Sequence, residues 1–233
     1  MDFIVVGILI AVFFGVMHLY KKARYAKELV YIKEYEFSRS IKNKLLDKYP
    51  HLDDEQIHLV FRALRDYFIF CHRANKRLVA MPSQVVDDAW HEFILFTRLY
   101  EHFCKKALGR FLHHTPTEAM QSPTMAQGGI KRAWRLACAK EHIDPKSPNR
   151  LPLLFSIDAI LNIPNGFTYA INCKDSKSSY FGDGYCAGHI ACGGGCGGDS
   201  GAPGDSSSGS LFDNFFDSDG GCSSGCGGGC GGD

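Results

Sequence analysis

Residues 83–116 read SQVVDDAWHEFILFTRLYEHFCKKALGRFLHHTP, and their pattern is the strongest evidence for a fold class. Ser83 is a helix-capping residue type and Gly109 a helix-stopping one, so the spacing predicts one helix between them. Apolar side chains recur along it at the intervals of a buried face. The expected core stripe comprises Val86, Trp90, Phe93, Thr97, Tyr100 and Cys104. Such a stripe requires neighbouring helices to cover it, which favours an all-α fold.

The same stretch holds many side chains that titrate or bind metals. Asp87 and His91 are four residues apart, so a helix places them on one face and within contact distance. They can supply two metal ligands or an acid–base couple, with His113 and His114 folding back as third and fourth ligands. His102 is excluded, because a straight helix separates it from His91 by about 16 Å. The candidate metal site is therefore Asp87, His91, His113 and His114, with zinc as the candidate cofactor.

Structural roles compete with this interpretation. An Asp and a His at this spacing often pair on a helix surface, and adjacent histidines in a turn are commonly solvated. Trp90 is typical of a packing residue whose indole N–H meets a carbonyl. The chain contains no nucleophile elbow, phosphate-binding loop, dinucleotide fingerprint or zincin helix. The sequence thus favours a structural role and leans away from an enzyme, with metal binding and acid–base catalysis as alternatives.

The N-terminal segment is apolar. Residues 3–20 read FIVVGILIAVFFGVMHLY, a run just long enough to cross a hydrocarbon core as a helix. It has neither the basic start nor the small-residue cleavage site of a secretory signal, so we expect an uncleaved anchor rather than a signal peptide or a buried helix of a soluble protein. Lys21, Lys22, Arg24 and Lys27 follow directly, which predicts an external N-terminus and a cytoplasmic body at the inner membrane of the cell.

Four regions follow from composition. We expect an anchor with a basic flank (1–24), an amphipathic stalk helix that continues it (25–49), a helical domain (50–181) and a Gly/Cys/Asp-rich tail (182–233). Within the domain, caps are expected at Asp53 or Asp54 and at Thr115, a helix near 131–141, and either a helix or a buried strand over 151–163. Since no segment shows sustained period-two alternation, the all-α class remains the prediction.

The tail differs in composition from the rest of the chain. Residues 182–233 contain seven Asp and no Lys or Arg, whereas residues 1–181 have a net charge of +8. With little apolar surface to bury, the tail is predicted to be disordered. Its cysteines recur at C-x3-C spacing, which suits zinc or another soft metal, although flexible reactive or modified thiols are the alternative. In a reducing cytoplasm disulfides are not expected. These candidates are Cys186, Cys192, Cys196, Cys222, Cys226 and Cys230.

One short tail segment combines aromatic and acidic residues. Residues 211–217 read LFDNFFD, and Phe212, Phe215 and Phe216 form a candidate docking segment for a basic apolar groove. The groove would belong to the basic body of this chain or to a protein partner. The alternative is an incidental low-complexity patch.

Several stretches resemble a known family. They are similar to the glycine-rich-domain-containing (GRDP-like) family and read VDDAWHEF (86–93), TRLY (97–100), FC (103–104), GRFLHH (109–114), LPLLFSID (151–158) and PNGF (164–167). That family is best known from plants, where members are linked to development and stress responses, and it has shorter bacterial members of unknown function. The resemblance covers roughly residues 50–170 and implies no established enzymatic activity. Plant members often have a second His two positions after the first, where this chain has Phe93, which weakens a metal site built on that pair.

The function expected from these observations is a single-pass bacterial membrane protein acting as a cytoplasmic-face binding or scaffold module. The lipid bilayer is one partner, and a protein bound through the tail is another. Nucleic acid is not expected, because the basic residues are spread along helices and many lie beside the anchor. There are two alternatives. The first is a metal-dependent enzyme, and the second is metal or redox sensing by the tail. Nothing in the sequence defines an oligomeric state.

Overall fold

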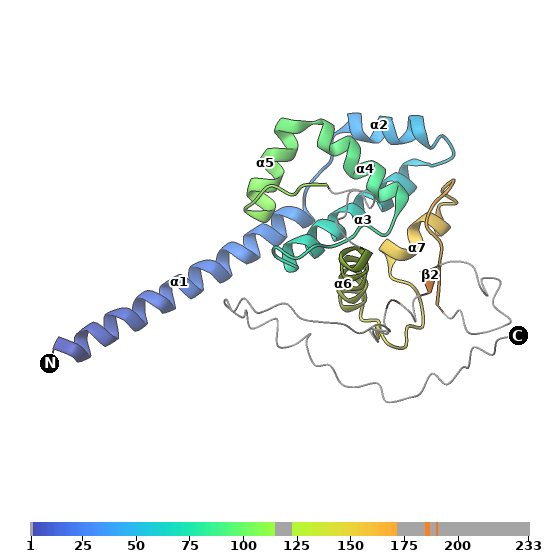
Figure 1. Cartoon of the computed structure of the whole chain (residues 1–233). Helices are drawn as coiled ribbons and strands as arrows, with labels where there is room; N and C mark the ends of the chain where they lie inside the picture. Colours follow the sequence, from blue (N-terminus) through green and yellow to red (C-terminus); the bar gives the residue numbers. More distant parts are fainter. Residues whose placement is uncertain (1, 115–122, 172–184, 187–189, 191–233) are drawn as a thin grey trace, which may run out of the picture. The chain divides into compact units, whose positions relative to one another are not determined.

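We describe the fold from a computed structural model, which covers residues 2–114, 123–171, 185–186 and 190 (Figure 1). The chain divides into two units, residues 1–193 and 194–233, and every described residue belongs to the first. Its helices are α1 (Asp2–Lys33), α2 (Arg39–Lys48), α3 (Asp54–Arg73), α4 (Gln84–Leu95), α5 (Thr97–Leu108), α6 (Pro123–Glu141) and α7 (Leu153–Ile160). Two-residue strands, β1 (Tyr169–Ala170) and β2 (Tyr185–Cys186), pair in parallel. The all-α prediction is confirmed.

Helix α3 lies at the centre of the described domain and packs against the other six helices (Figure 1). Asp53 is its N-cap, one of the two candidates from sequence, and Gln56 completes a capping box there that was not predicted. Its buried Phe68 contacts Phe103 at 4.8 Å between ring centroids, and Trp90 at 6.1 Å. A dense aromatic cluster therefore joins α3, α4 and α5.

The predicted stalk helix over 25–49 is wrong as a continuous element. Helix α1 ends at Lys33 and α2 begins at Arg39, and between them the rings of Tyr35 and Phe37 both enter the aromatic cluster. The ring centroids of Tyr35 and Phe103 are 4.6 Å apart, and those of Phe37 and Phe61 are 4.8 Å apart. Residues two apart on a helix point to nearly opposite sides, so both rings reach the core only because the helix stops. Their region belongs to the domain core.

The single helix expected from Ser83 to Gly109 is also two helices. The break falls at Phe96, where α4 ends and α5 begins. On one straight helix, Trp90 and Tyr100 would lie about 15 Å apart along the axis. In the structure they form a 3.1 Å hydrogen bond. The break therefore folds α5 back against α4. Residues before and after Phe96 consequently do not share the faces that a single helix would give them.

Other local predictions were accurate. Ser83 caps α4, and Gly109 ends α5 in the left-handed conformation, with φ of 65°. Segment 151–163 forms helix α7 rather than a strand. The core stripe is buried except at Thr97, which is exposed. The expected cap at Thr115 lies outside the described residues, as does nearly all of the tail.

Candidate metal centre

The start of α4 is held by a buried carboxylate from α7. Asp158 accepts hydrogen bonds from the Ser83 hydroxyl (2.7 Å), from the backbone N–H groups of Gln84 (2.7 Å) and Val85 (3.2 Å), and from that of Phe167 (2.9 Å). The first turn of a helix leaves its N–H groups without helical partners, and a negative charge there also faces the positive end of the helix dipole. Asp158 therefore fixes where α4 begins and so where its polar side chains lie.

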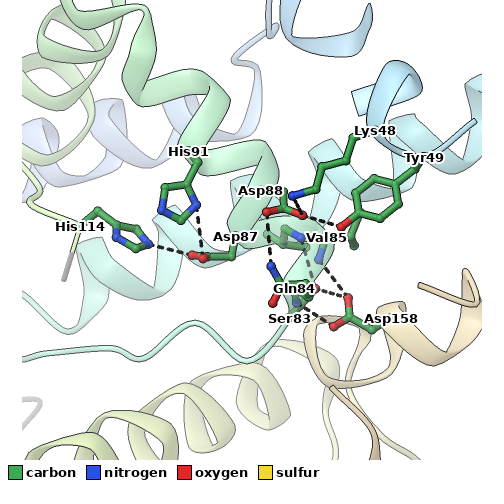
Figure 2. Close-up of polar contacts among 11 residues, drawn as sticks. Lys48, Tyr49, Ser83, Gln84, Val85, Asp87, Asp88, His91, His114 and Asp158 are labelled. Atoms are coloured by element: carbon green, nitrogen blue, oxygen red, sulfur yellow. Dashed lines mark hydrogen bonds and ion pairs between the residues drawn. The ribbon is translucent and has the colours of Figure 1, made fainter. Parts of the chain in front are cut away.

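One turn further along, Asp87 faces two imidazoles (Figure 2). His114 Nε2 lies 2.8 Å from Asp87 Oδ1, and His91 Nδ1 lies 3.3 Å from Asp87 Oδ2. The two imidazole rings are 4.1 Å apart between centroids. One potential ligand atom from each of the three residues lies within 4.8 Å of the others. Three of the four residues nominated from sequence are thus brought together.

His114 comes from the segment after α5, and a buried relay fixes that segment. Trp90 Nε1–H donates to the Tyr100 hydroxyl (3.1 Å), which donates to the Leu112 carbonyl oxygen (2.5 Å). The His114 ring then packs edge-on against Trp90, with 4.5 Å between centroids. The indole of Trp90 does find an oxygen, but that of a tyrosine rather than the carbonyl that we expected. This Trp90–Tyr100 relay sets the approach of His114 to Asp87.

His113 does not join the cluster, which corrects its nomination as a ligand. Its ring packs on Phe111, 4.8 Å between centroids, and its side chain is exposed. Neighbouring residues in an extended segment point to opposite sides, so only one histidine of the pair can face Asp87. His102 is exposed on α5 and lies outside the cluster too, as expected, although the Phe96 break rather than a straight helix separates it.

Asp88 points away from Asp87, toward α2 (Figure 2). It accepts a hydrogen bond from the Tyr49 hydroxyl, pairs with Lys48 Nζ at 2.8 Å and accepts a third contact from Gln84 at 3.3 Å. Burial, followed by the bond to this carboxylate, raises the pKa of Tyr49, which therefore stays a protonated donor. Asp88 joins α4 to α2 and serves a structural purpose.

The described cysteine thiols are poor candidates for chemistry. Cys71, Cys104 and Cys138 are free and buried. Burial raises the pKa of Cys71 to about 12 and that of Cys138 to about 12, and it raises that of Cys104 as well. Since the thiolate is the nucleophile and the metal ligand, these three are inert packing residues. The tail cysteines lie outside the described residues, apart from the backbone of Cys186 in β2.

Sequence reasoning missed Asp158 and the role of Tyr100. Asp158 lies 75 residues from Ser83, and its four donors come from two segments that only the fold brings together. The available signal was an aspartate among apolar residues in LPLLFSIDAIL, because a buried carboxylate requires partners. For Tyr100, the signal was a tyrosine on the apolar stripe, whose hydroxyl must find a bond when buried.

A family match agrees with the boundaries of this packed region. The model of the UCP032817-like family matches residues 27–190, which is more than half of the chain. The chain belongs to the UCP032817-like family. The matched segment begins in the last part of α1, where that helix joins the core, and includes Asp87, His91, Asp158 and the Trp90–Tyr100 relay. Comparison with curated proteins and with solved structures gives no match.

Proposed function

We propose that this UCP032817-like protein is a single-pass membrane protein whose anchor helix holds a binding or scaffold domain at the cytoplasmic face of the inner membrane. The observation that supports this best is helix α1. Its residues 3–20 are all exposed, including Phe3, Leu9 and Leu19 at 94, 62 and 66%. A continuous apolar surface of this kind is typical of contact with lipid. The helix is long and apolar enough to cross a membrane.

The same helix enters the domain core without a linker. Ile32 is fully buried, and Glu28 Oε2 lies 2.8 Å from His72 Nε2 on α3, where the His72 side chain is only 5% exposed. Arg24 pairs with Glu28 at 2.7 Å on the same face of α1. The anchor segment ends at Tyr20, and the first fully buried residue, Ile32, lies about 18 Å further along the same continuous helix. A rod sets height and orientation relative to the bilayer, which suits a scaffold.

Orientation rests on the basic flank. Lys21, Lys22, Arg24 and Lys27 follow the apolar run, and positive residues remain on the cytoplasmic side of membranes. The same charges favour anionic lipid headgroups.

We also propose that the host is bacterial and that the UCP032817-like family is related to the glycine-rich-domain-containing proteins, on the basis of the motif at 86–93. The anchor with its basic flank (1–24) and the tail (182–233) remain proposed divisions, whereas residues 25–49 pack with the helical domain.

Membrane anchoring is tested by alkaline carbonate extraction of membranes from cells that produce the full chain. The wild type should stay in the pellet. Leu9→Arg/Phe13→Arg places two charges in the span, at a cost of about 3 kcal/mol each on insertion scales, and should move the protein to the supernatant. Ile160→Arg is the matched control, because Ile160 is an exposed apolar residue outside the span. Extraction of the wild type would contradict the proposal. Protease protection of a C-terminal tag in right-side-out and inverted vesicles tests orientation.

The tail is the proposed site of partner binding, through Phe212, Phe215 and Phe216, or of metal or redox sensing. Its composition supports both proposals: aromatic residues among acids suit a basic groove, and C-x3-C spacing suits a soft metal. Replacing the six tail cysteines by serine should remove any tail metal, as measured by zinc titration. If the zinc stoichiometry does not change, tail sensing of zinc is excluded.

A further inference from the structure

We propose that Asp87, His91 and His114 form a binding site for one divalent transition-metal ion, and that the Trp90–Tyr100 relay positions His114 for it. This goes beyond anchoring and does not depend on it. The site differs from the one predicted from sequence, because it contains one histidine of the 113–114 pair and gains a positioning residue, Tyr100.

The ligand geometry is close to that of a bound ion. With metal–nitrogen distances near 2.0–2.1 Å, two ligand atoms of one tetrahedral ion lie about 3.3 Å apart. His114 Nε2 lies 2.8 Å from Asp87 Oδ1, and His91 Nδ1 lies 3.3 Å from Asp87 Oδ2, so the two histidines approach different oxygens of one carboxylate. The third pair, between the two histidines, lies within 4.8 Å. The side chain of His91 is 49% exposed, so its ring can rotate and bring its ligand nitrogen closer to that of His114 without moving the core.

The donor set selects the class of ion. Imidazole nitrogen suits zinc, cobalt, nickel, copper and iron, whereas calcium and magnesium prefer oxygen ligands. Two histidines and one carboxylate are also the protein ligands of many open zinc and iron(II) sites. The described residues supply three ligands, and His91 faces solvent, which leaves a coordination position for water or a small anion.

Buried contacts position the two segments that carry the three ligands. Asp158 and Ser83 hold the first turn of α4, which places the backbone of Asp87 and His91. His114 is fixed by the bond from Tyr100 to Leu112 and by its packing on Trp90. Asp87 and His114 lie 27 residues apart in two segments, and each segment is held by its own buried contacts. A chance pair of surface side chains would require no such support. Partners that orient a ligand typically contribute 10–100-fold to metal affinity.

The test uses the full chain in detergent, with serine at the six tail cysteines so that the tail cannot compete. Zinc is titrated by calorimetry, and cobalt(II) serves as a spectroscopic probe. We expect one equivalent of zinc. The cobalt spectrum should show d–d bands without the thiolate-to-cobalt charge-transfer band of cysteine ligands. His91→Ala and His114→Ala should each lower the affinity at least 100-fold, while His113→Ala, the neighbouring histidine outside the cluster, should leave it unchanged.

His91→Ala is the decisive variant, because its half-exposed side chain can be removed without disturbing the core. Absence of binding, unchanged affinity in His91→Ala, or a thiolate charge-transfer band would each overturn the proposal. If His114→Ala fails to fold, His91→Ala still decides.

The positioning role of Tyr100 has its own control. Tyr100→Phe should lower zinc affinity 10–100-fold while the stoichiometry stays at one. Tyr67→Phe removes a comparable buried bond, from the Tyr67 hydroxyl to the Val79 carbonyl at 2.9 Å, outside the relay. It should reduce stability similarly and leave affinity unchanged. Equal affinity losses in both variants, or none in Tyr100→Phe, would overturn the positioning role.

Discussion

Asp158 and Asp87 both serve the N-terminal half of α4, yet Asp158 is buried and accepts four hydrogen bonds, whereas the side chain of Asp87 is 22% exposed and faces two imidazoles. The donors of Asp158 are one hydroxyl and three backbone N–H groups, so its bonds complete the fold. The partners of Asp87 are side chains that also bind metals. The two carboxylates thus differ in what surrounds them: hydrogen-bond donors of the fold surround Asp158, whereas the partners of Asp87 are side chains that can also bind an ion.

The largest effect is expected from Asp158→Ala. The change leaves the Ser83 hydroxyl and the N–H groups of Gln84, Val85 and Phe167 without their partner, and each buried donor left unsatisfied costs about 1–3 kcal/mol. The losses are coupled, so we expect the free energy of unfolding to fall by about 3 kcal/mol or more. Chemical denaturation of the full chain in detergent, followed by far-UV circular dichroism, measures it. A loss below about 1 kcal/mol would contradict the assigned role of Asp158.

Gly166→Ala tests how closely the chain approaches Asp158. An added Cβ would lie 2.8 Å from the Asp158 Cβ and 3.0 Å from the Ile163 carbonyl oxygen, so the backbone must shift. Overpacking of this kind costs about 1–3 kcal/mol. Gly128→Ala in α6 is the matched control, because nothing lies within 4 Å of its added Cβ. That control should stabilise the protein by up to about 1 kcal/mol, since alanine favours helix. Equal effects at both glycines would argue against this packing.

Ser83→Ala separates the contribution of the Ser83 side chain, a local cap of α4, from that of Asp158, which caps the same helix from α7. Ser83 accepts a bond from the Val86 N–H at 3.3 Å and donates to Asp158, whereas Asp158 keeps its other three donors in the variant. Loss of a serine cap typically costs about 1 kcal/mol. We therefore expect a smaller fall in the free energy of unfolding than for Asp158→Ala, measured in the same denaturation experiment. The reverse order would show that the serine, rather than the aspartate, holds α4.

Local features of this fold could be predicted from sequence. Caps at Asp53, Ser83 and Gly109 depend on residues within one turn of the helix end, so spacing alone indicates them. The break at Phe96 could not be predicted, because neither glycine nor proline marks it. The bond between Trp90 and Tyr100 forms only when α5 folds back, so contacts across the fold favour the break. Tertiary packing overrides local helix preference there.

The candidate site was predictable in its α4 half only. Asp87 and His91 are four residues apart, so helical geometry brings them together. The choice between His113 and His114 depends on the direction of the chain after α5, which Tyr100 fixes through Leu112. Asp158 stayed unrecognised for the same reason, because its donors lie far away in sequence. Contacts across the fold, rather than residue types, separate a structural carboxylate from a candidate ligand.

The smallest effect on the metal-free protein is expected from His91→Ala, which tests directly whether Asp87 differs from Asp158. The pair with Asp87 is 3.3 Å long and the His91 side chain is 49% exposed, so its removal should change the free energy of unfolding by no more than about 0.5 kcal/mol. A ligand at 100 times its dissociation constant stabilises the folded state by about 2.7 kcal/mol. Wild type should therefore gain stability on adding zinc, in the background with serine at the tail cysteines, and His91→Ala should not. His113→Ala should respond to zinc like the wild type. A large fall in the free energy of unfolding of metal-free His91→Ala would instead show that the Asp87–His91 pair stabilises the fold. Asp87 would then be a structural carboxylate like Asp158.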